Sequence, residues 1–436
     1  MEPLTVGYIG IIILLLFFFI GLPVSFSMML VGFLGCIYLI PLEAAFNFLA
    51  IDIFETFTNY NLSVIAMFML MGTFASASGI TKKLFNAANI WIGSIRGGLC
   101  IATIIACAFF SATCGSCPAT AAAMGRVCLP EMRRYNYDDI ISTGCIAGSG
   151  VLGIIIPPSG VLIIYGLIAE QSIGELFVAG IIPGIILTGL FILTITIVCR
   201  IKPTAAPATA PTSWIMKIKA SPMFIETFII FGMVIGGLYT GWFTPTQAGA
   251  AGAVGALFLG LLRRTLGLQQ LWIAGKEALR ISSMVLCLVT GAIVFGHFLA
   301  VSLVSLTLPK WVAGLPIDRI YILIIICIFY IISGCFMDSM GMIVLTIPIV
   351  YPIIFHLGFD PIWFGVIMVV MVEIGVITPP VGINIYVLKG IAPNVPIENI
   401  FKGAIPFVLA LFVLLIILIA FPTIVTFLPY LLFRSH

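Results

Sequence analysis

Long apolar stretches alternate with short polar connections along the whole chain. A helix that crosses a bilayer needs roughly 20 predominantly apolar residues. Two stretches, 42–60 and 265–280, are too polar to span, and we expect each to form an amphipathic helix at a membrane interface. The other apolar segments predict an all-α polytopic membrane protein, and they cover residues 4–22, 24–40, 62–80, 98–128, 139–168, 176–199, 224–242, 246–262, 281–305, 320–355, 361–388 and 403–431.

Two of these segments are too long for one simple span. Residues 98–128 and 320–355 each contain small residues near the middle, at 112–116 and at Ser333-Gly334. Small residues allow a helix to end and the chain to turn tightly. The pattern predicts two re-entrant helical hairpins, each of which enters and leaves the membrane on the same side.

Two other segments, 139–168 and 361–388, are interrupted by a pair of prolines, at 157–158 and at 379–380. A proline pair removes two backbone donors and stops an α-helix. In hydrocarbon each freed polar group is costly unless something satisfies it. The pattern predicts two broken helices that hold a substrate or an ion, which is typical of secondary transporters built from repeats.

The two halves of the chain repeat at a fixed offset. The spacing between the two proline pairs equals the spacing between Pro23 and Pro245 and that between Pro130 and Pro352. Because each half contains an odd number of crossings, such a repeat is inverted. The predicted organisation is a first inverted repeat, a cytoplasmic linker with a flexible Ala/Pro/Thr-rich stretch at 203–213, and a second inverted repeat, at residues 1–200, 201–220 and 221–436 respectively.

Composition agrees with a membrane protein. The 436 residues are 62% hydrophobic and 8% charged, with a mean hydropathy of +1.28, whereas a soluble domain carries about 25% charged residues. The net charge is +3 and the chain contains no run of Lys and Arg, so we expect no nucleic-acid partner. Basic residues flank both ends of 98–128 and mark 201–220 as cytoplasmic. Counting crossings from there places both termini outside and makes the two hairpins point in opposite directions.

Polar residues gather at the two predicted hairpin turns. The first turn holds Ser111, Thr113, Gly115 and Ser116, and the second holds Gly334 and Asp338, which the repeat offset pairs with Ser116. A hard cation such as Na⁺ prefers carbonyl, hydroxyl and carboxylate oxygens. An acidic residue at membrane depth is a functional candidate by default, and Asp338 is the stronger candidate, ahead of Glu373. The alternatives are helix packing for the hydroxyls and the capping of a half-helix for Asp338.

Other function classes lack their motifs. The sequence has no G-x-x-x-x-G-K-[ST] for an ATP-driven motor and no H-E-x-x-H. We expect no enzymatic activity, because an intramembrane aspartyl protease needs two Asp residues at depth. The Cys114-x-x-Cys117 pair has redox spacing, but it lies in an apolar segment, and we expect a structural role. A passive channel remains an alternative.

Several motifs together resemble the large membrane subunit of tripartite ATP-independent periplasmic (TRAP) transporters, and the resemblance covers nearly the whole chain. They include the stretches at 71–79, 114–125, 153–159, 172–184 and 375–384. The resemblance implies Na⁺-driven import of an organic acid (carboxylate) across a bacterial inner membrane by an elevator mechanism. It also implies two partners, a small four-helix membrane subunit and a periplasmic substrate-binding protein. The alternative is a stand-alone Na⁺- or H⁺-coupled anion symporter that needs no binding protein.

The resemblance further implies a Na⁺ site between each hairpin and the broken helix that faces it. The implied residues of the first site are Ser111, Thr113, Gly115 and Ser116 with Gly150, Gly153 and Pro157. Those of the second are Gly334 and Asp338 with Gly375, Thr378 and Pro379. The N-termini of the second half-helices carry positive dipole ends, and we expect Ser159, Gly382 and Asn384 there to bind the substrate carboxylate.

Overall fold

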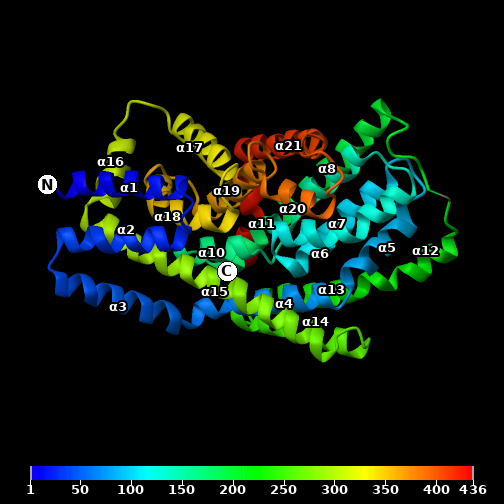
Figure 1. The fold of residues 1–436 in the computed structure, drawn as a ribbon, viewed down its shortest axis with the longest axis horizontal. Helices are drawn as coiled ribbons and strands as arrows, with labels where there is room; N and C mark the ends of the chain where they lie inside the picture. Colours follow the sequence, from blue (N-terminus) through cyan, green and yellow to red (C-terminus); the bar gives the residue numbers. More distant parts are fainter. Residues whose placement is uncertain (1, 210, 435–436) are drawn as a thin grey trace.

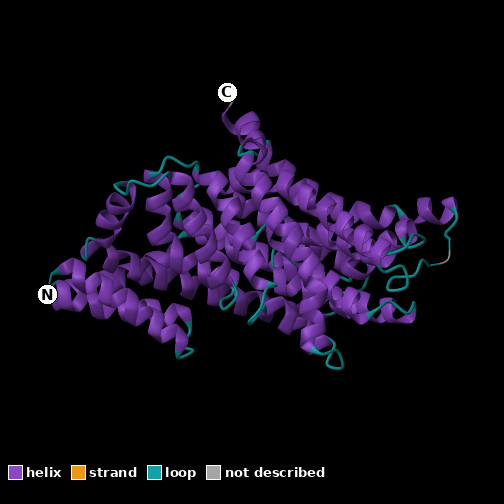
Figure 2. Ribbon diagram, turned by 90° about the horizontal axis from the view of Figure 1, so that it is seen from above, coloured by secondary structure: helices purple, strands orange, loops and turns teal. Residues whose placement is uncertain are grey.

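The computed structural model describes residues 2–209 and 211–434, and this part of the chain is helical throughout, without a strand. Figure 1 shows the helices of the first half, and Figure 2 shows that only short loops connect them. Their bounds are α1 (Pro3–Phe19), α2 (Val24–Leu39), α3 (Leu42–Thr58), α4 (Ser63–Ala77), α5 (Ile80–Ile92), α6 (Gly98–Cys114), α7 (Cys117–Arg134), α8 (Asp139–Gly150), α9 (Leu152–Ile155), α10 (Gly160–Ile168) and α11 (Ile173–Ile201).

The second half repeats the same order of hairpin, broken helix and long closing helix. Its bounds are α12 (Trp214–Ala220), α13 (Pro222–Tyr239), α14 (Pro245–Leu262), α15 (Leu268–Val301), α16 (Val304–Ala313), α17 (Arg319–Gly334), α18 (Ser339–His356), α19 (Pro361–Val376), α20 (Ile383–Ile391), α21 (Ile397–Ala420) and α22 (Thr423–Pro429).

Both predicted hairpins are present. The first consists of α6 and α7, which are joined at Gly115, and this glycine has a φ of 64°. A residue with a side chain rarely adopts that left-handed conformation, so the glycine allows the reversal. The second hairpin consists of α17 and α18, joined by residues 335–338. We call these pairs hairpin 1 and hairpin 2.

Both predicted broken helices are present too. The first consists of α8 and α9, a gap at 156–159, and α10; the second consists of α19, a gap at 377–382, and α20. The bonds Pro157–Pro158 and Pro379–Pro380 are both cis. We call the two gaps break 1 and break 2. The prolines of break 1 are buried, whereas those of break 2 are exposed.

The prediction of a separate helix at 265–280 is wrong. Residues 268–301 form one unbroken helix, α15, of 34 residues. The charged residues Lys276, Glu277 and Arg280 are good helix formers, and no proline follows them, so nothing ends the helix where its polarity changes. The equivalent stretch 42–60 does form its own helix, α3, which ends at Thr58, and a short turn then leads into α4.

The linker is docked against the protein, contrary to the flexible stretch that we predicted at 203–213. The backbone carbonyls of Ala205 and Ala206 accept hydrogen bonds from Asp138 and Gly97, at 2.9 and 3.0 Å. Both alanines are buried. The small side chains let the linker lie at the base of hairpin 1, where backbone donors hold it.

The predicted span 403–431 consists of two helices, because α21 ends before Pro422.

One group of helices forms a scaffold beside the hairpins: α2, α3, α4, α14 and α15, which we call the scaffold. Gly32 of α2 leaves no room for a side chain, because an added Cβ would lie 2.9 Å from the backbone of Phe295 in α15. Asp52 of α3 and His297 of α15 are hydrogen bonded at 2.8 Å. Small residues therefore set the helix spacing, as is common where helices associate in membranes.

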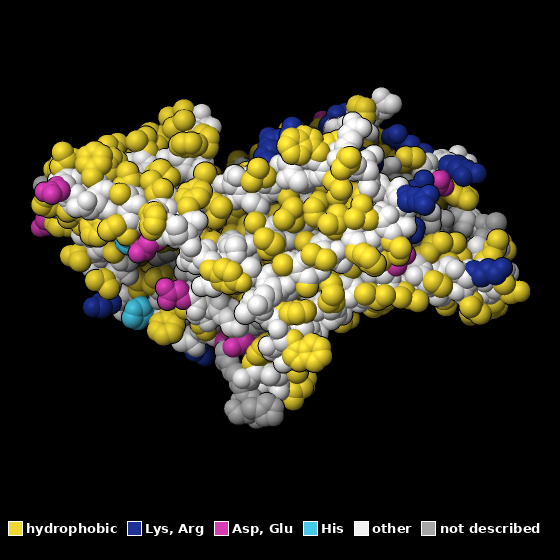
Figure 3. All heavy atoms as spheres, turned by 90° about the horizontal axis from the view of Figure 1, so that it is seen from below, with side chains coloured by type: hydrophobic (Ala, Val, Ile, Leu, Met, Phe, Trp, Pro, Cys, Tyr) yellow, Lys and Arg dark blue, Asp and Glu magenta, His cyan; other side chains and the backbone are white. Residues whose placement is uncertain are grey.

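Eight helical segments of the described chain are long and apolar enough to cross a membrane by length and composition, and further apolar helices are shorter. Large apolar side chains lie exposed on many of the outer helices. Figure 3 shows hydrophobic side chains spread over the visible face, with Lys and Arg gathered toward the end where α12 lies. An apolar surface of this extent suits a lipid environment.

The contact between α8 and α21 gives a test of the packing. A Cβ on Gly144 would overlap the backbone of Gly403, whereas a Cβ on Gly189 of α11 would meet nothing within 4 Å. We expect Gly144→Ala to lower the free energy of unfolding by roughly 1–3 kcal/mol through overpacking. Thermal melting of the purified protein in detergent measures this. Gly189→Ala is the control and should be neutral or slightly stabilising; equal melting temperatures for both variants would contradict the close contact.

Candidate functional site at the hairpin tips

The tip of hairpin 1 rests directly on break 1. The backbone N–H of Gly160 donates to the carbonyl of Gly115 at 3.2 Å. A Cβ on Gly115 would lie 2.9 Å from the Pro158 carbonyl oxygen, and a Cβ on Gly153 would lie 2.8 Å from the Ser116 carbonyl oxygen. At Gly115 the two backbones meet without a side chain between them, whereas at Gly153 the Thr120 hydroxyl also lies in the contact, 2.6 Å from an added Cβ. Carbonyl oxygens lie at both positions.

Hairpin 2 meets its broken helix in the same way. A Cβ on Gly375 would lie 2.5 Å from the carbonyl carbon of Gly334, and a Cβ on Gly334 would lie 3.0 Å from the Val372 carbonyl oxygen. The structure thus brings Gly334 together with Gly375 and Ser116 together with Gly153, while Gly115 meets Pro158 and Gly160. The first two are pairings that the sequence analysis placed at the two sites.

The hydroxyl groups are used within their own helices in this conformation. Ser111 donates to the Cys107 carbonyl at 2.6 Å, and Thr378 donates to the Ile374 carbonyl at 2.5 Å. Gly150 lies against Ala121, because a Cβ added to Gly150 would lie 3.0 Å from the Cβ of Ala121. The side chain of Thr113 lies outside the described residues. The oxygens that meet across both contacts are therefore backbone carbonyls, not these hydroxyls.

Asp338 caps the second arm of hairpin 2. Its carboxylate accepts hydrogen bonds from the backbone N–H groups of Met340 and Gly341, both at 3.1 Å. Ser116 occupies the equivalent N-cap position at the start of α7, as the repeat offset predicts. A carboxylate at this position satisfies free helix donors and is stabilised by the helix dipole.

The most deeply buried acidic residue is Glu373, which the sequence analysis ranked below Asp338. Glu373 on α19 has 0% exposure, and its Oε1 accepts a hydrogen bond from Ser339 Oγ at 3.0 Å. Asn384 on α20 is also fully buried, and its Nδ2 donates to Cys117 Sγ at 2.6 Å. The sequence does carry a signal for this residue, since Glu373 is a carboxyl in an otherwise apolar run, two residues before Gly375. The sequence does not show which side of α19 is buried, so the signal could not be ranked.

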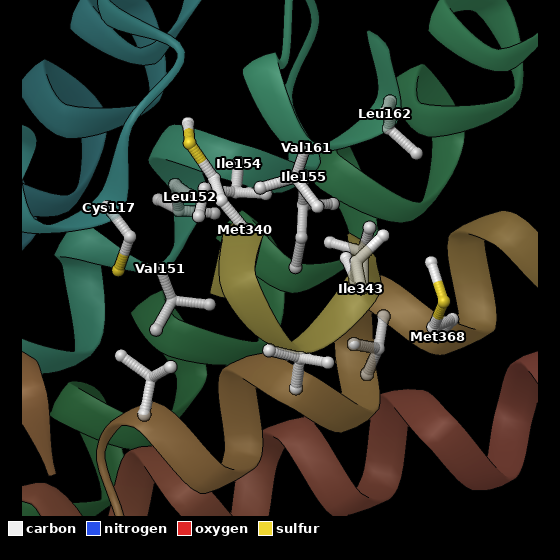
Figure 4. Close-up of a cluster of buried hydrophobic side chains, with 14 of the residues drawn as sticks. Cys117, Val151, Leu152, Ile154, Ile155, Val161, Leu162, Met340, Ile343 and Met368 are labelled. Carbon is white, nitrogen blue, oxygen red and sulfur yellow. The ribbon is translucent and has the colours of Figure 1, made fainter. Parts of the chain in front are cut away.

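The two halves interlock at the site. Met340 of hairpin 2 lies 3.1 Å from an added Cβ on Gly160 at the start of α10. Figure 4 shows the Met340 side chain beside Ile154 of the first broken helix. In the reverse direction, Leu388 of α20 packs on α7 of hairpin 1. Each hairpin thus contacts both broken helices. We call these four units, together with α11, which packs on the first broken helix, the core.

Comparison with known proteins identifies the family. The family described as "Tripartite ATP-independent periplasmic transporter, DctM component" matches residues 11–424. The chain belongs to this DctM family. It is therefore a multi-pass membrane protein of a transporter family, which is not a class of enzymes, and the prediction of the family is confirmed.

Individual relatives and a solved structure agree with this assignment. A C4-dicarboxylate TRAP transporter large permease protein DctM of Pseudomonas aeruginosa is 36% identical over 87% of this chain and 89% of its own length. The sialic acid TRAP transporter large permease protein SiaM of Vibrio cholerae is 30% identical over 97% of both chains. The crystal structure of the Alcanivorax borkumensis YdaH transporter, with 16% identity, shares the fold with a TM-score of 0.67 over 91% of this chain and 99% of that one.

The DctM-family chain contains a cavity of about 860 Å³ between scaffold and core. Its walls come from α4, the N-terminus of α14 and α15 on the scaffold side, and from residues 166–174 and Pro348 on the core side. Elsewhere the contact is apolar: Phe68 of α4 and Phe177 of α11 pack edge to face with ring centroids 5.6 Å apart. Few directional bonds therefore tie the two parts together here.

The glycine contact of hairpin 2 is testable. In Gly375→Ala the new methyl group would collide with the backbone of Gly334, so we expect the hairpin tip to move away from α19. Hydrogen exchange of residues 335–341, measured by mass spectrometry, should increase at least about tenfold, which corresponds to ~1.4 kcal/mol.

Gly390→Ala is the matched control, because Gly390 lies in α20 of the same broken helix with nothing within 4 Å of an added Cβ. Its exchange pattern at 335–341 should equal that of the wild type. If Gly375→Ala also exchanges like the wild type, the tip does not depend on this contact.

Proposed function

We propose that this DctM-family chain is the large membrane subunit of a TRAP transporter that imports a small organic acid across the bacterial inner membrane, driven by Na⁺. The observation that carries the proposal is that each hairpin tip rests on its broken helix through glycine contacts in a chain of this family. Relatives are named for C4-dicarboxylate, sialic acid and isethionate, which are all organic anions. An anionic substrate is therefore the chemical class that we infer.

Two partners follow from the tripartite nature of the family. We infer a small membrane subunit with four helices and a periplasmic protein that binds the substrate. The isethionate permease protein DctMQ of Oleidesulfovibrio alaskensis is 33% identical to this chain, which covers only 66% of that longer protein. The additional length of that relative is consistent with a second membrane unit in it.

The proposed Na⁺ sites use the carbonyl oxygens at the two hairpin contacts. Na⁺ binds oxygen ligands, and the carbonyls of Pro158, Ser116 and Val372 already lie where hairpin and broken helix meet. In the described residues no group of three or more His, Cys, Asp or Glu offers an alternative metal site. The full proposed sets stay as predicted: Ser111, Thr113, Gly115, Ser116, Gly150, Gly153 and Pro157 for the first, and Gly334, Asp338, Gly375, Thr378 and Pro379 for the second.

The substrate is proposed to bind beside these ions. Ser159 accepts a hydrogen bond from the Leu162 N–H at 3.2 Å and caps α10, while Gly382 precedes α20. Helix N-termini favour anions, and bound Na⁺ would add positive charge. Asn384 is buried in this conformation, so its contact with a substrate requires hairpin 1 to move. Because its prolines are exposed, break 2 is more accessible to a substrate than break 1.

An elevator movement is the proposed mechanism. The core is interlocked and should move as one body, whereas its contact with the scaffold includes apolar pairs such as Phe68–Phe177. Sliding of apolar surfaces breaks few hydrogen bonds, so the cost of movement is small. The cavity between scaffold and core supports this division, because it lies on the boundary that has to slide.

Reconstitution tests the function. The purified chain, the small membrane subunit and the binding protein encoded beside its gene are combined in proteoliposomes, with a panel of radiolabelled organic acids. We expect uptake of one acid only when all three proteins and an inward Na⁺ gradient are present. Uptake without the binding protein, driven by Na⁺ or H⁺, would instead identify a stand-alone symporter. Uptake that needs no ion gradient and does not accumulate the acid would identify a channel.

Asp338 gives a sharper test of the second Na⁺ site. Asn caps helices about as well as Asp, whereas replacement of a cap by Ala costs roughly 0.5–2 kcal/mol. We expect Asp338→Asn to keep the melting temperature but to raise the Na⁺ concentration for half-maximal uptake by about tenfold, or ~1.4 kcal/mol. Asp338→Ala should also lower the melting temperature.

Asp318 provides the control, because it caps α17 at the far end of the same hairpin, with Oδ1 2.8 Å from the Ile320 N–H. Asp318→Asn should leave the Na⁺ dependence unchanged. If Asp338→Asn gives the wild-type Na⁺ curve, Asp338 serves only as a helix cap.

A further inference from the structure

A groove of about 240 Å³ lies at the protein surface between α8, α11 and α21. Figure 1 shows α8 beside α21, which packs closely on it. The groove lies beside Gly403 of α21, where a Cβ would collide with the Ile140 carbonyl of α8. Most of its walls are apolar side chains from the three helices, and its charged residues are Lys202, directly after α11, and Lys402, near the start of α21. An apolar groove therefore carries two positive charges that come from different helices.

Both lysines are exposed and have no acidic partner. Within the described residues neither ammonium group forms an ion pair. Asp139 at the start of α8 is already engaged, because its Oδ1 lies 2.9 Å from Nε of Arg133. The two charges at the groove therefore suit an anionic ligand.

Apolar stripes lead away from both lysines. On α11 the exposed residues Ile201 and Ile197 precede Lys202, and on α21 the exposed residues Ile405 and Leu409 follow Lys402. Residues three or four positions apart share one face of a helix. Both helices are long and apolar enough to span a membrane, so the stripes run from the lysines into the hydrocarbon. A ligand with one anionic group and long apolar chains matches this surface, whereas a water-soluble anion leaves the stripes unused.

A second, polar cavity adjoins the groove. It has a volume of about 830 Å³ and shares Ile201 and Lys202 with the groove. Asn136, Asp138 and Thr204 are among its polar lining residues. Carboxylate and amide oxygens accept hydrogen bonds from hydroxyl groups. This cavity therefore suits a head group that carries hydroxyls beyond its phosphate, as glycerol does.

We propose that the groove between α8, α11 and α21 is a binding site for an anionic phospholipid. The phosphate lies between Lys202 and Lys402, a glycerol head group extends into the polar cavity, and an acyl chain packs on Val198 and Phe407 in the groove. Basic pockets between membrane helices are typical sites for anionic head groups. Since residues 201–220 are predicted to be cytoplasmic, the lipid belongs to the cytoplasmic leaflet. The site requires neither Na⁺ nor a transported acid, so it stands apart from the proposed transport function.

Native mass spectrometry of the purified full chain in detergent tests the site. Phosphatidylglycerol is the anionic probe, and zwitterionic phosphatidylethanolamine with the same acyl chains is the comparison. We expect the protein to retain phosphatidylglycerol more tightly. The double variant Lys202→Gln, Lys402→Gln should weaken that retention by at least about tenfold. Both lysines are exposed, so the variant should keep the wild-type melting temperature in the absence of lipid.

The double variant Lys276→Gln, Arg280→Gln is the matched control. It removes the same charge from two exposed positions on α15 of the scaffold, and it should retain phosphatidylglycerol like the wild type. An equal loss in both double variants would show attraction to the basic surface as a whole and would overturn the site. Equal retention of the two lipids by the wild type would overturn it as well.

Two further measurements distinguish a lipid from other occupants. Val198→Trp fills the groove but keeps both lysines, so it should weaken the retention of phosphatidylglycerol; unchanged retention in a folded variant would contradict the seating of an acyl chain. Inorganic phosphate at the same concentration should not displace the lipid. Displacement by phosphate would identify a site for a free anion, and displacement by the small membrane subunit would identify a protein interface. Either result would overturn the proposal.

Discussion

The structure depends on one constraint: a helix that is broken inside an apolar protein must find partners for its freed backbone groups. In the first broken helix one of these partners is a hairpin tip, because the N–H group of Gly160 donates to the carbonyl of Gly115. The approach is possible because glycines lie at the points of contact, with Gly115 against Pro158 and Gly375 against Gly334. Side chains at these positions would separate the backbones. The glycines thus bring carbonyl oxygens close to the neighbouring backbone at both contacts.

The interlocking of the two halves follows from the same constraint. Each hairpin packs on the broken helix of its own half and also contacts the second half-helix of the other half, as Met340 does at Gly160. Neither half can bury its broken helix and its hairpin alone, so the core behaves as one body. The scaffold, in contrast, is held by small residues and aromatic packing, such as Gly32 on Phe295. The proposed elevator movement rests on this contrast between an interlocked core and an apolar boundary.

Two acidic residues at hairpin 2 illustrate how environment separates their roles. Asp338 is half-buried and uses its carboxylate to satisfy two backbone donors at the start of α18. Glu373 is fully buried, receives one hydroxyl donor, and has an oxygen without a partner. The first environment stabilises a negative charge through the helix dipole. The second disfavours it. The two carboxyl groups, although close in the structure, therefore lie in opposite electrostatic environments.

The sequence by itself determined the local features of the backbone. Proline pairs stop helices, glycines allow turns, and the repeat offset predicts that Asp338 and Ser116 share an N-cap position, as they do. These features depend on residues next to each other in the chain. The sequence did not determine that α15 is continuous. The polarity of the segment changes part-way along, which suggested a boundary, but good helix formers continue across that point. Nor did it show that the linker docks at Ala205 and Ala206, where partners come from distant backbone groups.

Only the tertiary structure decided which side of each apolar helix is buried in protein. In a membrane protein the lipid-facing and the protein-facing sides are both apolar, so no periodicity distinguishes them. The burial of α19 on all sides, and with it the burial of Glu373 beside Ser339, follows from the packing of hairpin 2 and of α10, α11, α21 and α22 around it. The sequence therefore located the hairpins and the breaks, while the packing decided which polar side chains meet inside the core.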